Sequence, residues 1–280
     1  MPLSTYNKIP VPSFMYGTAW KKEASTKLVE LAVESGFKAI DTANQIIHYD
    51  EARVGEALKK IFSKGIKRED LFIQTKFTHT TGQDHRTPYD KEADFGTQVK
   101  QSMASSLAHL HTEYLDSYVL HGPYSRYEFG AEDKEAWASM EELYEAGKTR
   151  CLGISNVSAE QLKQLLNYAK VRPMFVQNRC YAIRVWDKDV REICRENGII
   201  YQGFSLLTAN SQELSKPAIS AICRRLGATP AQVIFAFCRQ IGMLPLTGTT
   251  SASHMKEDLL SEGFELTENE IASIEAISLH

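Results

Sequence analysis

Four polar residues lie at or just after the ends of short apolar runs, and together they could transfer a proton. Asp41, Lys76 and His121 each close such a run, and Tyr49 follows Asp41 at the distance of a loop. The runs are short and continuous, as expected for buried strands of a parallel sheet. If the strands close into a barrel, their carboxyl ends open on one face, so the four side chains meet in one pocket.

The chemistry of these groups depends on which of them are charged. Lys76 would point among apolar neighbours, where an ammonium is costly unless paired, and Asp41 is its natural partner. Taken alone, this pair could be a structural salt bridge. A Lys cation within about 4–6 Å lowers the pKa of a phenol from its usual value of about 10, so Tyr49 beside Lys76 becomes a candidate acid.

His121 stands before Gly122-Pro123, a dipeptide that ends the strand. A single His at a strand end is most often a hydrogen-bonded core residue. If it faces the same pocket as Tyr49, a neutral imidazole N–H could hold a carbonyl oxygen in line for attack. The four residues therefore predict a site that donates a proton to a carbonyl compound.

Strand-like runs alternate with helical patterns along the chain. Eight such units predict an α/β fold, a (β/α)8 TIM barrel of parallel strands with outer helices, in one domain spanning residues 1–280. The alternative is an open doubly wound sheet, but the Gly-x-Gly-x-x-Gly turn typical of that fold does not follow the first strand. The predicted strands are residues 14–17, 38–41, 71–76, 117–121, 151–155, 175–177, 200–204 and 244–247. The predicted helices are residues 24–34, 51–62, 98–110, 134–146, 159–168, 187–196, 230–239 and 268–277. Predicted helix starts are Ser158 and Thr229, and predicted helix ends are Gly36, Gly147 and Gly198.

Composition and charge exclude several classes of protein. The 280 residues are 43% hydrophobic, and 32 basic residues face 35 acidic ones, so nucleic acid is not an expected partner. No apolar stretch reaches the roughly 18 residues of a membrane span, and residues 1–12 do not resemble a signal peptide. Five irregularly spaced cysteines without Cys-x-x-Cys indicate reduced thiols in a cytoplasmic protein. We expect no metal site, and a monomer or weak homodimer.

Short motifs follow one another in a fixed order from residue 17 to residue 233. They are Gly17-Thr18-Ala19-Trp20, Ile40-Asp41-Thr42-Ala43, Val54-Gly55-Glu56-Ala57-Leu58, Thr75-Lys76, Leu120-His121-Gly122-Pro123, Gly153-Ile154-Ser155-Asn156-Val157, Val176-Gln177-Asn178 and Thr229-Pro230-Ala231-Gln232-Val233. In this order and spacing the chain resembles the aldo-keto reductase family. The resemblance implies an NAD(P)H-dependent carbonyl reductase on an eightfold barrel. The family's Asp–Tyr–Lys–His tetrad corresponds to Asp41, Tyr49, Lys76 and His121.

The tyrosine departs from the family pattern. In most members it comes five residues after the Asp, whereas here it comes eight after. Counting back from Val54-Gly55 without gaps puts His48 at the acid position. We favour Tyr49, because a loop can absorb one residue and a phenol suits the chemistry better. His48 remains the alternative acid.

The resemblance also implies where the cofactor binds. NADP(H) is expected, with NAD possible because His254 stands where an Arg that would hold the 2′-phosphate is common. Phe204 would stack on the nicotinamide, although barrel packing is its alternative role. Phosphate sites after the last two strands are common in this barrel. The implied residues are Ser155, Asn156 and Gln177 for the nicotinamide amide, then Phe204, Ser205, Leu207, Asn210, Thr247, Gly248, Thr249, His254, Glu257 and Asp258.

Aromatic residues in loops at the strand ends predict the substrate pocket. An aromatic mouth suits planar or apolar carbonyl compounds, and Arg126 or Arg184 could attract a carboxylate or simply be solvated. The chain ends at His280 without the tail that closes over the pocket in many relatives, so we expect an open site. The substrate-binding candidates are Trp20, His48 and Tyr124, with Tyr127, Phe129 and Trp186 nearby.

The sequence thus predicts an enzyme that reduces aldehydes or ketones to alcohols by hydride transfer, with Tyr49 as proton donor. The alternative is a non-catalytic or slow cofactor-binding barrel that acts as a regulatory subunit, since fold alone does not establish function. The displaced Tyr49 mildly favours that alternative, and the complete tetrad disfavours it.

Overall fold

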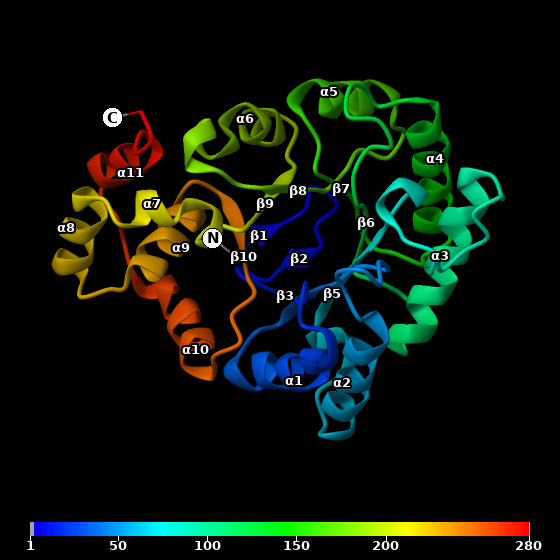
Figure 1. Cartoon of the computed structure of the whole chain (residues 1–280), viewed down its shortest axis with the longest axis horizontal. Coiled ribbons are helices and arrows are strands. Elements are labelled where there is room, and N and C mark those ends of the chain that lie inside the picture. The colour runs from blue at the N-terminus through cyan, green and yellow to red at the C-terminus, as the bar shows by residue number, and fades with distance from the viewer. Residues whose placement is uncertain (1–2, 280) are drawn as a thin grey trace.

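Eight parallel strands form a closed barrel at the centre of the molecule (Figure 1). The computed structural model describes residues 3–279, so Met1, Pro2 and His280 of the predicted domain lie outside the described residues. Neighbouring strands follow the order of the chain, and the last pairs with the first. The strands are β3 (Met15–Gly17), β4 (Ala39–Asp41), β5 (Phe72–Phe77), β6 (Ser117–Leu120), β7 (Leu152–Ser155), β8 (Phe175–Arg179), β9 (Ile200–Phe204) and β10 (Met243–Thr247).

All eight predicted strands are confirmed, with ends shifted by at most two residues. The largest shift is at β8, which continues to Arg179 because Asn178 and Arg179 pair in register with Gly203 and Phe204 of β9. His121 lies just beyond β6, although its backbone N–H still donates to the carbonyl of Phe77 at 2.8 Å. The candidate residues therefore lie at the carboxyl ends of the strands.

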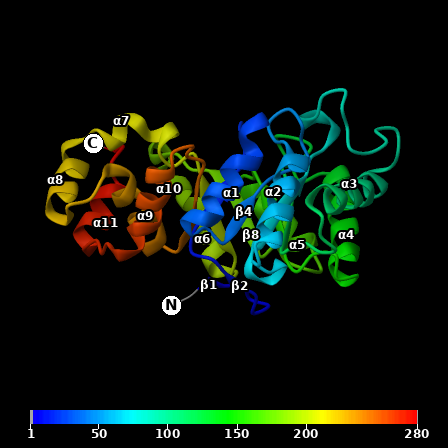
Figure 2. The same cartoon turned by 90° about the horizontal axis from the view of Figure 1, so that it is seen from below.

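Helices surround the barrel (Figures 1 and 2). Those that correspond to predicted helices are α1 (Ser25–Ser35), α2 (Glu51–Ser63), α3 (Phe95–Leu110), α4 (Ala131–Glu145), α5 (Ala159–Tyr168), α6 (Lys188–Glu196), α9 (Pro230–Gln240) and α11 (Glu268–Glu275). Three helices were not predicted, α7 (Ser211–Leu214), α8 (Pro217–Leu226) and α10 (Ala252–Leu260). In the part of the chain that the structure describes, no helix is both long and apolar enough to cross a membrane.

Local capping explains where several helices begin and end. The hydroxyls of Ser158 and Thr229 accept the backbone N–H three residues on, and the Gln at that position closes a capping box. Gly36 follows α1 with φ of 117°, a left-handed conformation that an L side chain rarely adopts. The predicted helix starts and this helix end are confirmed.

A two-stranded hairpin covers the end of the barrel opposite the candidate residues. It consists of β1 (Leu3–Ser4) and β2 (Pro10–Val11) and was not predicted. Tyr6 and Asn7 between its strands donate to the carbonyls of Arg172 and Arg150, just before β8 and β7 begin. Figure 2 shows the hairpin at the lower edge of the molecule, away from the long loop that follows β5.

Candidate active site

A buried ion pair forms the floor of the site. The Lys76 ammonium lies 2.7 and 2.8 Å from the two carboxylate oxygens of Asp41 and donates a further hydrogen bond to the Thr42 carbonyl at 2.7 Å. Lys76 is completely buried. Burial lowers its pKa, and the facing Asp41 carboxylate acts in the opposite direction. The predicted pairing is present, and three acceptors satisfy the ammonium.

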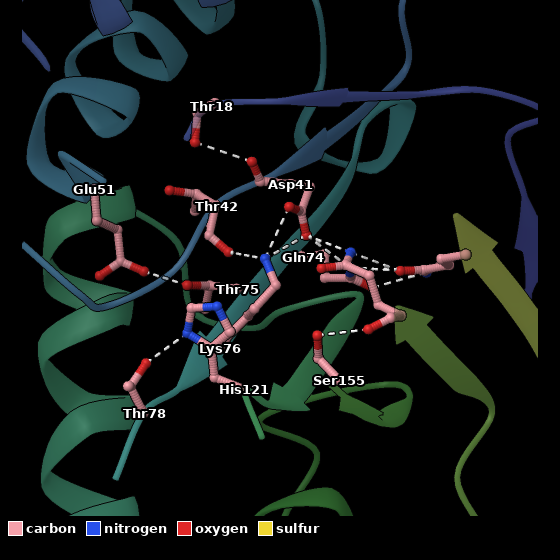
Figure 3. A network of polar contacts seen from close by, with 12 residues as sticks. Thr18, Asp41, Thr42, Glu51, Gln74, Thr75, Lys76, Thr78, His121 and Ser155 are labelled. Carbon is pink, nitrogen blue, oxygen red and sulfur yellow. Dashed lines mark hydrogen bonds and ion pairs between the residues drawn. The ribbon is translucent and has the colours of Figure 1, made fainter. Parts of the chain in front are cut away.

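Three glutamines from the barrel interior hold the Asp41 carboxylate in place, and Figure 3 labels one of them, Gln74. The amide nitrogens of Gln74 and Gln177 donate to the same Asp41 oxygen at 2.7 and 3.1 Å. Gln202 accepts from both of these amides and donates back to Gln74 at 3.0 Å. Since each amide has partners within the barrel, the carboxylate has little freedom to rotate away from Lys76.

Tyr49 lies beside this pair. Its ring centre is 5.1 Å from the Lys76 ammonium and 5.8 Å from the ring centre of His121. The sequence-based prediction of a lowered phenol pKa is wrong for this structure: burial first, and then the Asp41 charge, raise the pKa of Tyr49, with Arg179 opposing them. The charge of Lys76 is largely compensated by Asp41, so the phenol keeps its proton at neutral pH.

His121 faces the same space from the end of β6. Burial, followed by the charges of Lys76 and His48, holds the pKa of its imidazole well below the usual value, so the ring is neutral. Its Nδ1 is 2.7 Å from the Thr78 hydroxyl (Figure 3). Within residues 3–279 the Thr78 hydroxyl has no other hydrogen-bond partner, so its proton has no acceptor except Nδ1. We therefore infer that the hydroxyl donates to Nδ1. The proton of the ring is then on Nε2.

His48, the alternative acid, contacts Gln45 and Trp20 and not the buried pair. Its Nδ1 is 2.7 Å from the Gln45 side-chain oxygen, and its ring centre is 4.2 Å from that of Trp20. In the described part of the chain His48 has no hydrogen bond to Asp41 or Lys76. The geometry brings Tyr49, rather than His48, next to the buried pair.

A long cavity runs from the tetrad along the ends of β7 to β10 and on to α10. We call it the strand-end cavity; its volume is about 630 Å³. Its wall includes Asp41, Tyr49 and His121 at one end and α10 at the other. Every residue predicted to bind the cofactor, except Asn210, lies on this wall: Ser155, Asn156, Gln177, Phe204, Ser205, Leu207, Thr247, Gly248, Thr249, His254, Glu257 and Asp258.

Asn210 is the exception because it holds a loop together. Its side-chain oxygen accepts from the Ala182 backbone N–H at 2.7 Å, and its amide donates to the carbonyls of Cys180 and Leu206. The side chain is therefore used in joining two loops. Asn210, which the sequence predicted to bind the cofactor, therefore does not line the strand-end cavity.

Three residues of this wall have strained backbone. Trp20, Asn156 and Ser205 have φ of 63°, 52° and 58°, in the left-handed region that side chains usually avoid. Asn156 is held there by hydrogen bonds from its amide to the His121 carbonyl and the Ser155 hydroxyl. Such strain is typical of functional sites, where the surrounding structure enforces it.

The cavity fits an elongated dinucleotide. Near the tetrad the wall offers Ser155, Asn156 and the side-chain oxygen of Gln177, and it also includes Lys21, whose ammonium contacts the Gly248 carbonyl. At the far end the Thr247 hydroxyl donates to Asp258 at 2.8 Å. Burial raises the pKa of Asp258 to about 6. The wall is thus polar at both ends and carries the cation Lys21 as well as carboxylates.

A second cavity of about 410 Å³ opens beside the tetrad, and we call it the mouth cavity. Trp20 and His48 line it as predicted, together with Tyr49, His121 and Phe204. Trp20 is 64% exposed, which excludes a core role.

Several predicted mouth residues lie elsewhere. Tyr124 lines neither cavity, because its ring packs edge-on against His79 and Phe95. Tyr127 is 90% exposed, and Phe129 is buried in the core. Trp186 is buried too, and its indole N–H donates to the Ile274 carbonyl at 2.9 Å. Loop residues could not be assigned to the pocket from sequence position alone.

The structure adds wall residues that were not predicted from the sequence, and four of them bear on the chemistry of the site. Lys21 belongs to the strand-end cavity, and Thr78, His79 and Arg179 belong to the mouth cavity. A period-two pattern continued past Lys76 would have suggested Thr78, two residues on and on the same face of the strand. No cluster of metal-ligating side chains occurs among the described residues.

The chain was compared with known proteins. The model of the aldo/keto reductase family matches residues 13–279. An uncharacterized oxidoreductase of Bacillus subtilis, YtbE, is 30% identical over 277 residues, covering 98% of this chain and 91% of that protein. Glyoxal reductase of the same organism is 28% identical with the same coverage of both chains.

Solved structures share the fold. The aldose reductase of Schistosoma japonicum has a TM-score of 0.85 at 23% identity, covering 100% of this chain and 93% of that chain. An aldo-keto reductase solved in complex with NADPH has a TM-score of 0.85 at 22% identity, covering 99% and 87%. At these identities the likeness shows the barrel fold, which confirms the predicted (β/α)8 architecture.

Proposed function

The chain belongs to the aldo-keto reductase family, and we propose that it reduces aldehydes or ketones to alcohols with NADPH, with Tyr49 as the proton donor. One observation carries the proposal. Tyr49 and His121 line both the strand-end cavity and the mouth cavity, directly above the Asp41–Lys76 pair. A carbonyl carbon at this junction would have a cofactor on one side and proton-donating groups on the other.

Each member of the tetrad has a separate task in this mechanism. Asp41 keeps Lys76 charged and in place, so a cation lies under the Tyr49 ring while negative charge develops on the carbonyl oxygen. The raised pKa of Tyr49 keeps the phenol protonated before the reaction. The phenol then gives its proton to the forming alkoxide, and the Lys76 ammonium stabilises the phenolate that remains.

His121 orients the substrate. As a neutral ring with its proton on Nε2, it donates a hydrogen bond to the carbonyl oxygen without competing as an acid. Thr78 is a positioning residue, because it acts only through the Nδ1 of His121. This arrangement holds the oxygen within reach of Tyr49.

NADP(H) is the cofactor of this family, and when bound it supplies the hydride. Ser155, Asn156 and Gln177 would hold the nicotinamide amide, and Phe204 would stack on the ring. Thr247, Gly248 and Thr249 would bind the phosphates, with His254 and Glu257 at the adenosine end. Because none of the described residues of this wall is an Arg, we expect a weak preference for NADPH over NADH.

The test compares Tyr49→Phe with wild type in the reduction of 4-nitrobenzaldehyde by NADPH, followed by cofactor absorbance. We expect kcat to fall at least about 100-fold, the usual contribution of a general acid, with unchanged cofactor affinity by fluorescence titration. Tyr127→Phe, a matched change outside both cavities, should keep wild-type turnover. Equal rates for wild type and Tyr49→Phe would refute the assignment.

The same experiment addresses the regulatory-subunit alternative. A raised phenol pKa and a tyrosine that lies out of register are compatible with a slow enzyme. Tight cofactor binding together with turnover near zero in wild type would favour that alternative. A larger loss in His48→Gln than in Tyr49→Phe would move the acid role to His48.

A further inference from the structure

The mouth cavity has an unusual distribution of charge. Among the described residues of its wall, Arg179 alone carries a fixed charge outside the tetrad. The other polar groups are imidazoles, amides and hydroxyls, and no carboxylate lies on this wall. A cavity of this kind favours a negatively charged ligand over a neutral one of the same shape.

Arg179 is held beside the reacting groups. It is the last residue of β8, and its guanidinium carbon lies 5.6 Å from the centre of the Phe204 ring. Its charge lowers the pKa of Tyr49 against the stronger effects of burial and Asp41, so it is within electrostatic reach of the phenol. The cation is therefore attached to a rigid strand end and not to a loop.

Nothing in the described chain neutralises this guanidinium. Within residues 3–279, no Asp or Glu forms an ion pair with Arg179, and no hydrogen bond of its side chain is seen. The side chain is exposed to solvent at the cavity wall. An Arg that serves structure normally has a carboxylate or carbonyl partner, as Arg191 has in Glu275 at 2.6 Å.

A groove continues from the mouth cavity past Arg179, and we call it the side groove. It shares Gly122, Pro123, Asn156 and Arg179 with the mouth cavity. Its wall carries four cationic residues, Arg126, Arg179, Arg184 and Lys188, against the two carboxylates Asp187 and Asp189. Asp187 already accepts from the Asn178 amide at 2.9 Å and the Tyr201 hydroxyl at 2.8 Å. The groove is thus net positive, and it leads away from Tyr49.

We propose that the substrates of this site are carbonyl compounds that carry a carboxylate, and that Arg179 binds that carboxylate. The sequence analysis considered Arg126 and Arg184 for this role, but these residues line only the side groove. A guanidinium can bind a carboxylate with two parallel hydrogen bonds, which fixes the orientation of the carbonyl end as well as adding affinity. This proposal rests on the proposed reductase function.

The test uses two aldehydes of nearly equal shape, 4-carboxybenzaldehyde and methyl 4-formylbenzoate, with NADPH. For wild type we expect a kcat/KM about tenfold higher for the acid, as a charge-assisted hydrogen bond predicts. In Arg179→Gln the ratio should fall close to one. Added salt should reduce the ratio in wild type, because this cation is exposed.

Arg224→Gln is the matched control. Arg224 is an exposed residue of α8 that lines none of the three cavities, and its removal changes the net charge equally. It should keep the wild-type ratio. Arg184→Gln tests the side groove separately from the mouth cavity. A larger fall of the kcat/KM ratio in Arg184→Gln than in Arg179→Gln would overturn the role of Arg179.

The two proposals fail differently. If wild type reduces both aldehydes at equal kcat/KM, the reductase function holds and carboxylate recognition is refuted. If it reduces neither while still binding NADPH, the reductase function is refuted. If Arg179→Gln lowers both rates equally and the ratio stays near ten, Arg179 acts on turnover and does not select the substrate.

Discussion

The two cavities that meet at Tyr49 are built differently. The strand-end cavity combines residues at or next to the ends of β7 to β10 with residues of α9 and α10, whereas the mouth cavity is formed mostly by loops after β3, β4, β5 and β6. Strand ends are fixed by the pairing of the whole barrel, and loops are fixed by side-chain contacts particular to this chain. The difference teaches that the binding of a common cofactor and the choice of substrate depend on separate parts of one fold.

Breaking the buried Asp41–Lys76 pair, which lies beside Tyr49, should give the largest effect. In Lys76→Met an unpaired carboxylate remains buried, so we expect the free energy of unfolding to fall by about 3–5 kcal/mol and activity to be lost. Urea unfolding measures the change.

An exposed pair provides the contrast. Lys60 and Glu30 are 2.9 Å apart at the surface, and Lys60→Met should cost less than about 1 kcal/mol. A similar small loss in Lys76→Met would mean that the floor of the site does not depend on its ion pair for stability.

The next largest effect is expected from substitution of Thr78, which lines the mouth cavity. Thr78→Val keeps the shape of the side chain but removes the hydroxyl that donates to His121, so the proton of the ring can move to Nδ1. We expect kcat/KM to fall about tenfold, with 15N chemical shifts of the His121 ring reporting the change of tautomer. Thr78→Ser should restore both. An unchanged tautomer in the Val variant would contradict the positioning role.

Substitution of Asp258, at the far end of the strand-end cavity, should give the smallest effect. Burial raises the pKa of Asp258 from 3.8 to about 6. The folded protein therefore binds more protons than the unfolded one between these values, and stability is lost as pH rises from about 4 to about 6. Asp258→Asn should be more stable than wild type at pH 7.5, by about 1 kcal/mol.

Urea unfolding at pH 4.5 and pH 7.5 measures this effect. The advantage of Asp258→Asn should be smaller at pH 4.5, where Asp258 of the folded wild type is mostly protonated. A constant difference at both pH values would assign the change to packing and not to ionisation.

The sequence predicted the barrel well, and it placed Asp41, Lys76 and His121 at strand ends, because both depend on short-range patterns. Apolar runs define strands, and barrel closure brings the carboxyl ends of distant strands together. Tyr49 could be favoured over His48 only by its chemistry, since the loop after Asp41 hides the register. Its pKa was predicted in the wrong direction, because burial and the Asp41 charge raise it and a sequence does not show how deeply a phenol is buried.

The sequence-based predictions that the structure does not support concern loops and long-range contacts. Asn210 and Trp186 resemble site residues by position, yet each makes hydrogen bonds to a backbone distant in sequence. Arg179 was overlooked because β8 is two residues longer than its apolar run, and only pairing with β9 shows this. Such contacts depend on the folded chain as a whole.

One turn beside the side groove bears on how the protein could be redesigned. Val185, Trp186 and Asp187 have φ of 50°, 56° and 58°, three consecutive left-handed residues. The buried Trp186 ring and the hydrogen bonds of Asp187 hold this backbone in place. A variant library aimed at new substrates would keep this turn constant, because insertions in the turn would free the wall of the side groove. The library would vary the exposed Ile183 and Arg184 beside the turn.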